Sequence, residues 1–312
     1  MANYFSVLLT VVTILTGLLW ALDSWKFKPA RAARLREEER RLNTTLSTAA
    51  QQDLVPQPWW AEYSQSIFPV IAAVLILRSF LYEPFQIPSG SMMPTLLRGD
   101  FILVEKFAYS VRDPLFRSEL IAVNKPERGD VAVFKFPPDP RQDFIKRVVG
   151  LPGDRIIYRD KTLYIQPACE SDAAQCPSPQ QVTTTLMDRA EYFRGPYPLD
   201  RMREQLGEVT HDILVDSQDA ANPLRYYQQD GTAFDEWVVP ADHYFMMGDN
   251  RDNSEDSRYW GFVHQDLLVG EAVFIWMSFE MDRPASSWLP QWVPTGVRWA
   301  RLGPIGIDET AE

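Results

Sequence analysis

The sequence is poor in cysteine and histidine, and it has fewer basic than acidic residues. Its 312 residues include two cysteines and three histidines, and the formal net charge is −11. The acidic excess argues against nucleic acid as a partner, because phosphate binding needs a basic surface. His211, His243 and His264 have no metal-ligand spacing, and no HExxH, GxSxG, P-loop or SxxK pattern occurs. We therefore expect no metal and no cofactor.

The only cysteines, Cys169 and Cys176, stand on either side of six polar or small residues. This spacing suits a loop that a short-range disulfide would close, so the two residues are a disulfide candidate. A disulfide there would indicate an oxidising compartment.

Two apolar runs occupy the first 82 residues. Residues 4–22 carry no charge and are long enough for a helix to cross a bilayer, and residues 61–82 reach a similar length with an interfacial aromatic pair at one end and Arg78 at the other. The loop 23–60 between them is basic at Lys26, Lys28, Arg31, Arg34, Arg36, Arg40 and Arg41. The positive-inside rule therefore predicts this loop in the cytoplasm, with residues 1–3 and 83–312 outside. A cleavable signal peptide is the competing interpretation of the first run, but no basic segment precedes it.

Beyond residue 100 the pattern changes to short β-type runs separated by Gly, Pro and Asp. The expected strands are 101–104, 131–136, 144–149, 155–158, 163–165, 238–239, 244–247 and 272–277. Helical periodicity is scarce, so we expect a mainly β domain over residues 83–312. The more polar residues between the two β blocks predict an inserted subdomain at about 155–240.

A Ser/Gly turn between two prolines follows the second apolar run, at residues 87–96. Pro88 and Pro94 fix φ and remove donors, so Gly90 would bend the backbone and leave Ser91 projecting with a free N–H. This geometry suits a nucleophile. An ordinary turn before a strand is the alternative interpretation.

A nucleophilic serine needs a base, and the sequence has none of the usual histidine arrangements. Lys146 lies in the expected strand 144–149, where alternation places Phe144 and Val148 on its own face. A lysine accepts a proton only when it is neutral, and burial must lower its pKa by about two units from its usual value. These apolar neighbours would permit that burial. A lysine that extends from an exposed face is the alternative.

Further segments join turn residues and charge to a short apolar strand. They are residues 128–136, 143–154 and 248–261. Together with Pro88-Ser-Gly-Ser-Met they resemble the sequence boxes of the bacterial type I signal peptidases, or leader peptidases, in the same order. The resemblance covers about residues 60–165 and 240–280, and the two apolar runs with a long insertion resemble the Gram-negative two-span form.

The resemblance implies a membrane-bound serine endopeptidase that removes N-terminal signal peptides from exported preproteins. Its fold would be two transmembrane helices followed by a mainly β catalytic domain of the signal peptidase type, with an inserted β-rich subdomain. It would lie in the bacterial inner membrane with its catalytic domain in the periplasm. The implied partners are preproteins that bear signal peptides and the lipid bilayer, with the secretion machinery as a further candidate.

The resemblance also implies roles for individual residues. Ser91 would be the nucleophile and Lys146 its base, Ser254 would orient the lysine, and Ser89 would join the Ser91 N–H in holding the oxyanion. Asp256 and Arg258 match an ion pair that braces the site, although a solvated surface pair is the alternative. The substrate pocket would be lined by Ile87, Pro88, Phe144 and Ile145. Family members often carry an aromatic hydroxyl at the position of Phe144, so pocket preference could differ here.

Two other interpretations compete with the peptidase. One is a catalytically inactive, membrane-anchored module that presents a peptide-binding groove; the presence of both Ser91 and Lys146 separates the enzyme from it. The other is a self-cleaving protein similar to the LexA-type repressors, which share the Ser/Lys pair and the β fold. Those proteins lack two membrane spans and carry a DNA-binding segment, which this sequence does not show.

Overall fold

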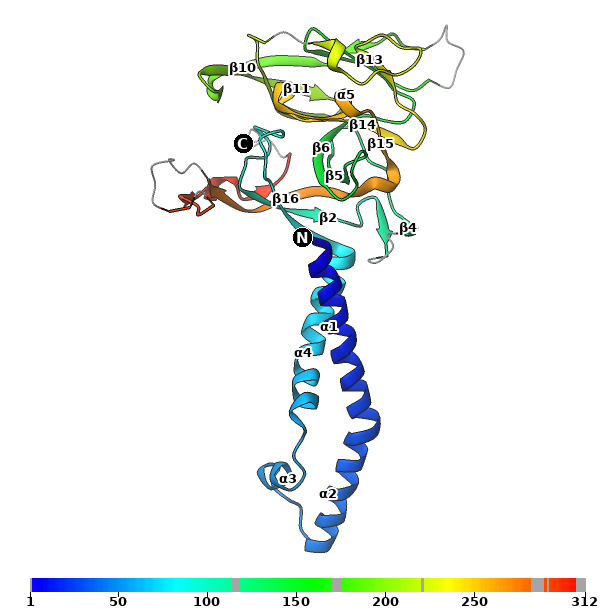
Figure 1. Ribbon diagram of the computed structural model, residues 1–312, viewed down its shortest axis with the longest axis vertical. Coiled ribbons are helices and arrows are strands. Elements are labelled where there is room, and N and C mark those ends of the chain that lie inside the picture. The colour runs from blue at the N-terminus through cyan, green and yellow to red at the C-terminus, as the bar shows by residue number, and fades with distance from the viewer. Residues whose placement is uncertain are drawn as a thin grey trace. The chain divides into compact units, whose positions relative to one another are not determined.

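The computed structural model describes residues 2–113, 118–169, 176–219, 222–281, 289–290 and 292–306. The chain divides into two compact units, Met1–Leu81 and Tyr82–Glu312 (Figure 1). The first unit is helical and the second is mainly β, as the sequence predicts. Each unit is described by itself below.

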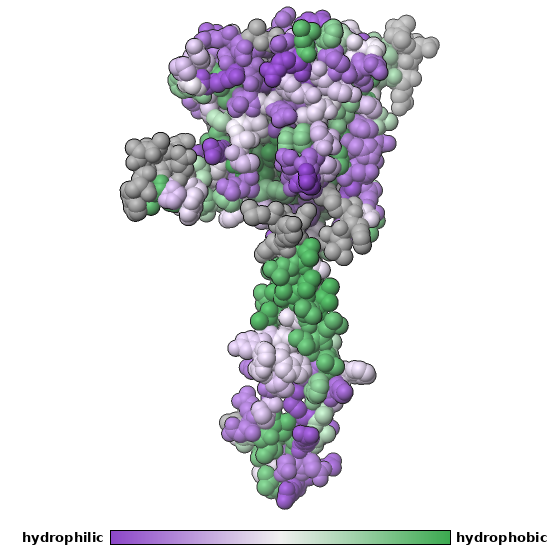
Figure 2. All heavy atoms as spheres, in the orientation of Figure 1, coloured by the Kyte–Doolittle hydropathy of each residue, from purple (hydrophilic) through white to green (hydrophobic). Residues whose placement is uncertain are grey.

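The helical unit contains two helices that are long and apolar enough to cross a membrane, Val7–Leu42 and Trp59–Leu81. Its elements are α1 (Ala2–Leu22), a π-helical turn (Asp23–Phe27), α2 (Lys28–Leu42), α3 (Thr48–Leu54), α4 (Trp59–Ile76) and a second π-helical turn (Leu77–Leu81). Helices α1 and α4 pack together where Gly17 lets the Phe68 ring approach; a Cβ on this glycine would lie 2.7 Å from that ring. Hydrophobic residues cover these two helices (Figure 2). Most of their large apolar side chains are not covered by other residues of the protein. Such surfaces suit a hydrocarbon environment.

The basic segment between the two apolar helices is itself helical over α2, where we expected a loop. Its sequence is rich in Ala, Arg, Glu and Leu, which have high helix propensity. Pro29, which has no N–H to donate, lies just after the π-helical turn that joins α1 to α2, and Asn43 ends the helix in the left-handed conformation with φ of 47°. Asp23 and Arg31 also form an ion pair at 2.7 Å across the π-helical turn. Charge composition therefore indicated the basic character of this segment but not its helical structure.

The β unit is built on one antiparallel sheet with the strand order β1-β2-β16-β5-β6-β14-β15, and β17 and β18 also pair with β16. These strands are β1 (Tyr82–Gln86), β2 (Asp100–Glu105), β5 (Val131–Lys135), β6 (Asp143–Gly150), β14 (His243–Met247), β15 (Val263–His264), β16 (Leu268–Glu280), β17 (Gly296–Val297) and β18 (Gly303–Pro304). A separate hairpin is formed by β3 (Ser110–Arg112) and β4 (Glu119–Ala122). Each of the expected strands overlaps one that the structure contains.

Between β6 and β14 the chain forms two smaller sheets, with the orders β13-β7-β8-β9 and β10-β11-β12. Their strands are β7 (Arg155–Arg159), β8 (Thr162–Gln166), β9 (Gln180–Gln181), β10 (Thr183–Arg194), β11 (Tyr197–Leu206), β12 (Val209–Val215) and β13 (Glu236–Val238). Cys169 and Cys176 form a disulfide between β8 and β9, with their Cα atoms 5.7 Å apart. We refer to residues 155–238 as the insertion.

The insertion shares a hydrophobic core with the main sheet. One cluster of buried side chains joins Trp237 and Ile156 of the insertion to Phe245 and Met247 of β14. Because β13 pairs with β7, the chain leaves and re-enters the main sheet at neighbouring points. This packing brings β11 and β12 close to the segment that follows β14 (Figure 1). That segment contains a 3₁₀ turn (Arg251–Asn253) and the short helix α5 (Ser257–Trp260). The described chain also forms 3₁₀ turns at Pro223–Arg225, Gln265–Leu267 and Trp299–Arg301.

Candidate active site

The turn that carries Ser91 lies in the loop between β1 and β2. The Ile87 N–H donates to the Asp100 carbonyl oxygen at 2.8 Å, and the Gly99 N–H donates to the Ile87 carbonyl oxygen at 3.1 Å, so the two ends of the loop are tied together. Ser91 lies within it and is 8% exposed. No described residue accepts a hydrogen bond from the Ser91 N–H.

Gly90 is required by close packing and not by an unusual backbone angle. It is not among the residues with positive φ, so the expected tight bend does not use the left-handed region. A Cβ at this position would instead lie 2.9 Å from the Met93 sulfur. A larger residue would require the flexible Met93 side chain to move.

Ser91 and Lys146 come together across the main sheet. Lys146 lies in the middle of β6, opposite Ala132 on β5, and is 4% exposed. Its Nζ is 2.8 Å from the Ser91 Oγ, within hydrogen-bond distance, and it donates to the Ile145 carbonyl oxygen at 3.0 Å. The two residues stand 55 positions apart in the sequence.

Burial lowers the pKa of Lys146 to about 8. The loss of water around the ammonium group is the largest cause. Asp256, Asp249 and Glu255 oppose this effect because their negative charges favour the protonated form, and Arg258 adds to it. A large fraction of Lys146 is therefore neutral near pH 8, so the side chain can accept a proton.

One aromatic ring lies next to the amine of this lysine, and further rings pack behind it. The Phe144 ring lies 5.5 Å from the Lys146 Nζ. Phe136 stacks on Phe144 with ring centroids 4.2 Å apart, and Trp260 contacts Phe136 edge-on at 5.8 Å. The alternation predicted for β6 thus places an aromatic face next to the amine, and the stack holds that face in one orientation.

Ser89 and Ser254 both lie near the pair but differ in their contacts. Ser89 is exposed, and its Oγ lies 3.4 Å from the Ser91 Oγ. Ser254 is buried, and together with Arg258 its hydroxyl lowers the pKa of Asp256, although its Oγ makes no hydrogen bond of ordinary geometry among the described residues. It lies against Gly248, where an added Cβ would come within 2.2 Å of the Ser254 Oγ. The structure thus puts Ser254 at the site without a hydrogen bond to Lys146.

Asp256 and Arg258 form a buried ion pair and not a surface one. Two hydrogen bonds of 2.8 Å join the guanidinium to the carboxylate, and both side chains are at most 1% exposed. Burial by itself would raise the pKa of Asp256, but Arg258 holds it below its usual range. Asp256 also accepts a hydrogen bond from the Gly248 N–H at 3.0 Å. The pair therefore fixes the backbone that passes next to Ser254.

A second buried ion pair lies behind the lysine and was missed by the sequence reasoning. Arg147 follows Lys146 and points to the opposite side of β6, where it pairs with Asp249 at 2.8 and 2.7 Å. The Thr95 hydroxyl donates to Asp249 at 2.5 Å, and Arg147 also donates to the Gly129 carbonyl oxygen at 2.7 Å. The charged segments that hold Arg147 and Asp249 were visible in the sequence, but strand alternation does not indicate which acid meets which base.

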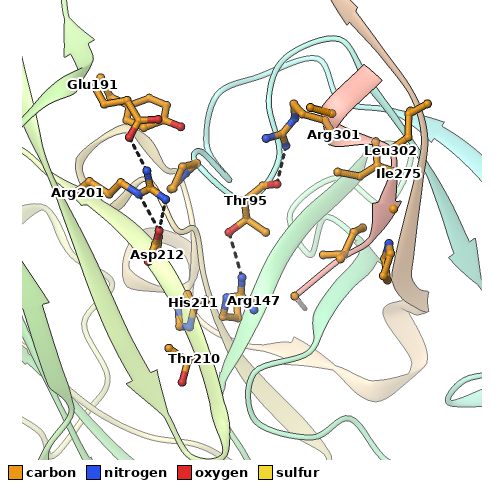
Figure 3. Close-up of a pocket in the computed structure, with 17 residues that line it drawn as sticks. Thr95, Arg147, Glu191, Arg201, Thr210, His211, Asp212, Ile275, Arg301 and Leu302 are labelled. Atoms are coloured by element: carbon orange, nitrogen blue, oxygen red, sulfur yellow. Dashed lines mark hydrogen bonds and ion pairs between the residues drawn. The ribbon is translucent and has the colours of Figure 1, made fainter. Parts of the chain in front are cut away.

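The other expected pocket residues differ in how far they are buried. Ile87 is 3% exposed and belongs to the same apolar cluster as the half-buried Ile145, and Pro88 is exposed. A cavity of about 520 Å³ lies elsewhere, behind the serine loop (Figure 3). It is lined by Thr95 and Arg147 but by neither Ser91 nor Lys146, so it is distinct from the candidate site at these two residues.

Comparison with known proteins relates the chain to one family. The family model described as "Signal peptidase, peptidase S26" matches residues 60–277. Signal peptidase I of Pseudomonas fluorescens is 41% identical over 95% of this chain and 99% of that protein, and that of Buchnera aphidicola from Acyrthosiphon pisum is 40% identical over 98% and 100%. Signal peptidase I of Haemophilus influenzae is 37% identical over 96% and 91%. A solved signal peptidase I from Enterococcus faecalis is 26% identical, covers 48% of this chain and 98% of its own, and has a TM-score of 0.25.

The buried ion pair predicts a large loss of stability from Asp256→Asn. The change keeps the side-chain size but leaves the Arg258 charge buried without its partner, and such losses are about 3–5 kcal/mol. Thermal or denaturant unfolding of the full chain in detergent measures this. Asp139→Asn is the matched control, because it breaks an ion pair with Arg141 whose arginine is 88% exposed; it should hardly change the unfolding midpoint. Equal effects of the two variants would contradict the structural role of Asp256.

Proposed function

Because the chain belongs to the peptidase S26 family of signal peptidases, we propose that it is a membrane-bound serine endopeptidase with a Ser91–Lys146 dyad. Its substrates would be exported preproteins, from which it removes the N-terminal signal peptide. The curated relatives support signal peptide cleavage. The assignment of this cleavage to Ser91 and Lys146 is our proposal.

One observation carries the assignment of the dyad. The Ser91 Oγ and the Lys146 Nζ lie 2.8 Å apart in a site where burial lowers the pKa of the lysine to about 8. A serine hydroxyl next to a neutral amine is an activated nucleophile. A peptide-binding module without catalysis would not need a lysine desolvated against a serine, so this geometry favours the enzyme.

The reaction would begin with proton transfer from the Ser91 hydroxyl to the neutral Lys146 amine. As this proton moves, the Ser91 Oγ forms a bond to the scissile carbonyl carbon, and the carbonyl oxygen becomes an oxyanion. The Ser91 N–H and the Ser89 hydroxyl would donate hydrogen bonds to that oxyanion; the loss of one such donor typically slows the reaction by about 10²–10³-fold. The Lys146 ammonium then gives its proton to the leaving amine as the C–N bond breaks.

The signal peptide would remain as an ester on Ser91 while the mature protein leaves. Lys146, neutral again, would take a proton from water as the water oxygen attacks the ester carbonyl. Collapse of the second tetrahedral intermediate breaks the C–O bond to Ser91, and the lysine returns the proton to the serine oxygen. Ser254 is proposed to orient the lysine during these transfers, and Asp256 and Arg258 to hold the surrounding backbone.

The proposed substrate pocket requires small side chains. An extended signal peptide would add as a strand beside residues 87–89 or β6, and alternation would direct its first and third side chains before the cut into the same groove. Ile87, Pro88, Phe144 and Ile145 would form the walls. By resemblance to the family, alanine is favoured at both positions. Phe144 stands where relatives often have an aromatic hydroxyl, so we expect an altered pocket preference with turnover retained.

The proposed location is a bacterial inner membrane with residues 83–312 in the periplasm. The apolar helices α1 and α4 lie on either side of the basic helix α2 in the chain, and the positive-inside rule predicts α2 in the cytoplasm. The disulfide between Cys169 and Cys176 supports an oxidising compartment for the β unit.

Replacement of Lys146 by arginine tests the dyad. Arginine keeps the length and charge but does not lose its proton at working pH, so Lys146→Arg should lower kcat by about 10²–10⁴-fold. For the wild type, kcat/KM should rise with pH with a midpoint near 8, because the base is active when its proton is absent. The measurement is cleavage of a preprotein by purified full-length protein in detergent, with sequencing of the new N-terminus.

Ser91→Ala is the matched control, since it removes the nucleophile and little buried apolar area. Both variants should remain folded and bind preprotein. A folded Lys146→Arg variant that cleaves near the wild-type rate would exclude the lysine as the base, and His211, His243 and His264 would then have to be tested in turn.

Protease treatment of intact spheroplasts tests the location. The β unit should be digested from outside, because it follows two spans that begin with an outer N-terminus. A cytoplasmic marker protein should survive in the same sample, which shows that the membrane is intact. Protection of the β unit until the cells are lysed would mean that the topology is wrong.

A further inference from the structure

The main chain of Ser91 is held by residues 248–254, which follow β14. The Asn250 N–H donates to the Ser91 carbonyl oxygen at 3.1 Å, and the Asn250 Nδ2 donates to the Gly90 carbonyl oxygen at 3.0 Å. A Cβ on Gly248 would lie 2.5 Å from the Ser91 carbonyl oxygen, so the two backbones are in close contact. A shift of this segment would therefore move the Ser91 main chain and change the distance between its Oγ and Lys146.

The same segment is held from its other side by β11 and β12 of the insertion. The Leu214 N–H on β12 donates to the Asp249 carbonyl oxygen at 2.9 Å. Glu204 on β11 forms an ion pair and a hydrogen bond with Arg251, and both side chains are 1% exposed. Arg251 directly follows Asn250, the residue that holds the serine loop. The insertion thus contacts Arg251, and the preceding residue, Asn250, contacts the main chain of Ser91.

His211 on β12 fills the space between this ion pair and Arg147. Its Nε2 lies 3.3 Å from the Glu204 Oε1 and 3.7 Å from the Asp249 Oδ1, and its ring lies beside Arg147 (Figure 3). Burial and the charge of Arg147 lower the pKa of His211, which keeps the ring neutral at neutral pH. Burial alone would raise the pKa of Glu204, but Arg251 beside it brings that pKa down to about 2. Glu204 is therefore ionised, and its charge is directed to Arg251.

We propose that Glu204, acting through Arg251, is a positioning residue for the Ser91–Lys146 pair. The ion pair fixes the backbone on which Asn250 stands, and Asn250 fixes the serine loop. The insertion then contributes to catalysis, because Glu204 on its strand β11 helps to set the position of Ser91. This role rests on the peptidase activity proposed above, and Glu204 itself makes no contact with the reacting groups.

The chain contains a matched control on the same pair of strands. Asp212, the neighbour of His211 on β12, pairs with Arg201 and Arg203 of β11 at 2.6 and 2.9 Å. It is 11% exposed, and these ion pairs stay within the insertion. Asp212→Asn should therefore weaken the insertion without moving the segment that holds Ser91.

The test compares Glu204→Gln, the double variant Glu204→Gln/Arg251→Gln, and Asp212→Asn. For each, kcat and KM for preprotein cleavage and the thermal unfolding midpoint are measured on the full chain in detergent. Glu204→Gln should lower kcat by about tenfold or more with KM changed by less than about threefold, since a small misplacement of reacting groups affects the chemical step most. The double variant, which leaves no buried charge without a partner, should recover much of the unfolding midpoint but not kcat. Asp212→Asn should lower the midpoint and keep kcat within about twofold of the wild type, because its reacting groups stay in place.

A purely structural role predicts that kcat follows the unfolding midpoint in all three variants. Recovery of kcat in the double variant, or Glu204→Gln with wild-type kcat, would overturn the positioning role. If Glu204→Gln is too unstable to assay, the double variant decides alone by its kcat. Wild-type protein that cleaves no better than Ser91→Ala would instead contradict the proposed peptidase function, so the two failures are distinguishable.

Discussion

The proposed chemistry depends on the removal of one lysine side chain from water. Lys146 is 4% exposed, and its burial lowers its pKa to about 8. A shift of this size corresponds to about 3 kcal/mol of lost charge stabilisation, a large fraction of the stability of an ordinary domain. The rest of the β unit has to tolerate this loss while keeping the amine within reach of Ser91.

Two buried ion pairs lie near Lys146 and affect its charge and its position relative to Ser91. Asp256–Arg258 and Arg147–Asp249 lie on different sides of Lys146, and each is joined to backbone that passes the serine loop. Because each carboxylate has its own arginine, neither acts as a dedicated counterion of the lysine. An unpaired carboxylate in contact with Lys146 would raise its pKa and keep the amine protonated at neutral pH. Because Arg258 and Arg147 pair with Asp256 and Asp249, these carboxylates can hold the serine loop in place without cancelling the effect of burial on the pKa of Lys146.

The sequence predicted β2, β5, β6, β14 and β16 of the main sheet but not its strands β1, β15, β17 and β18. Ser91 and Lys146 were paired by resemblance to the signal peptidases and by the need of a nucleophilic serine for a base. Strand alternation placed Phe144 on the face of the lysine, where the structure has its ring. The same reasoning could not find Glu204 and His211, because they lie in a polar segment whose charged residues look solvated until β11 and β12 pack against residues 248–254. Alternation gives the face of a side chain, whereas the partner of a buried charge depends on contacts between segments far apart in the chain. The helical structure of residues 28–42 was missed for another reason: a basic segment was interpreted by its charge and not by its helix propensity.

A direct titration of the Lys146 amine tests the central claim. Selective isotope labelling of lysine side chains, with the Lys146 signal assigned by its absence in Lys146→Arg, allows its ionisation to be followed by NMR in the folded protein. We predict a midpoint near pH 8 for the folded wild type and a return to the usual lysine value of about 10.4 after denaturation. A midpoint near the usual value in the folded protein would mean that the amine is protonated at working pH and cannot be the base.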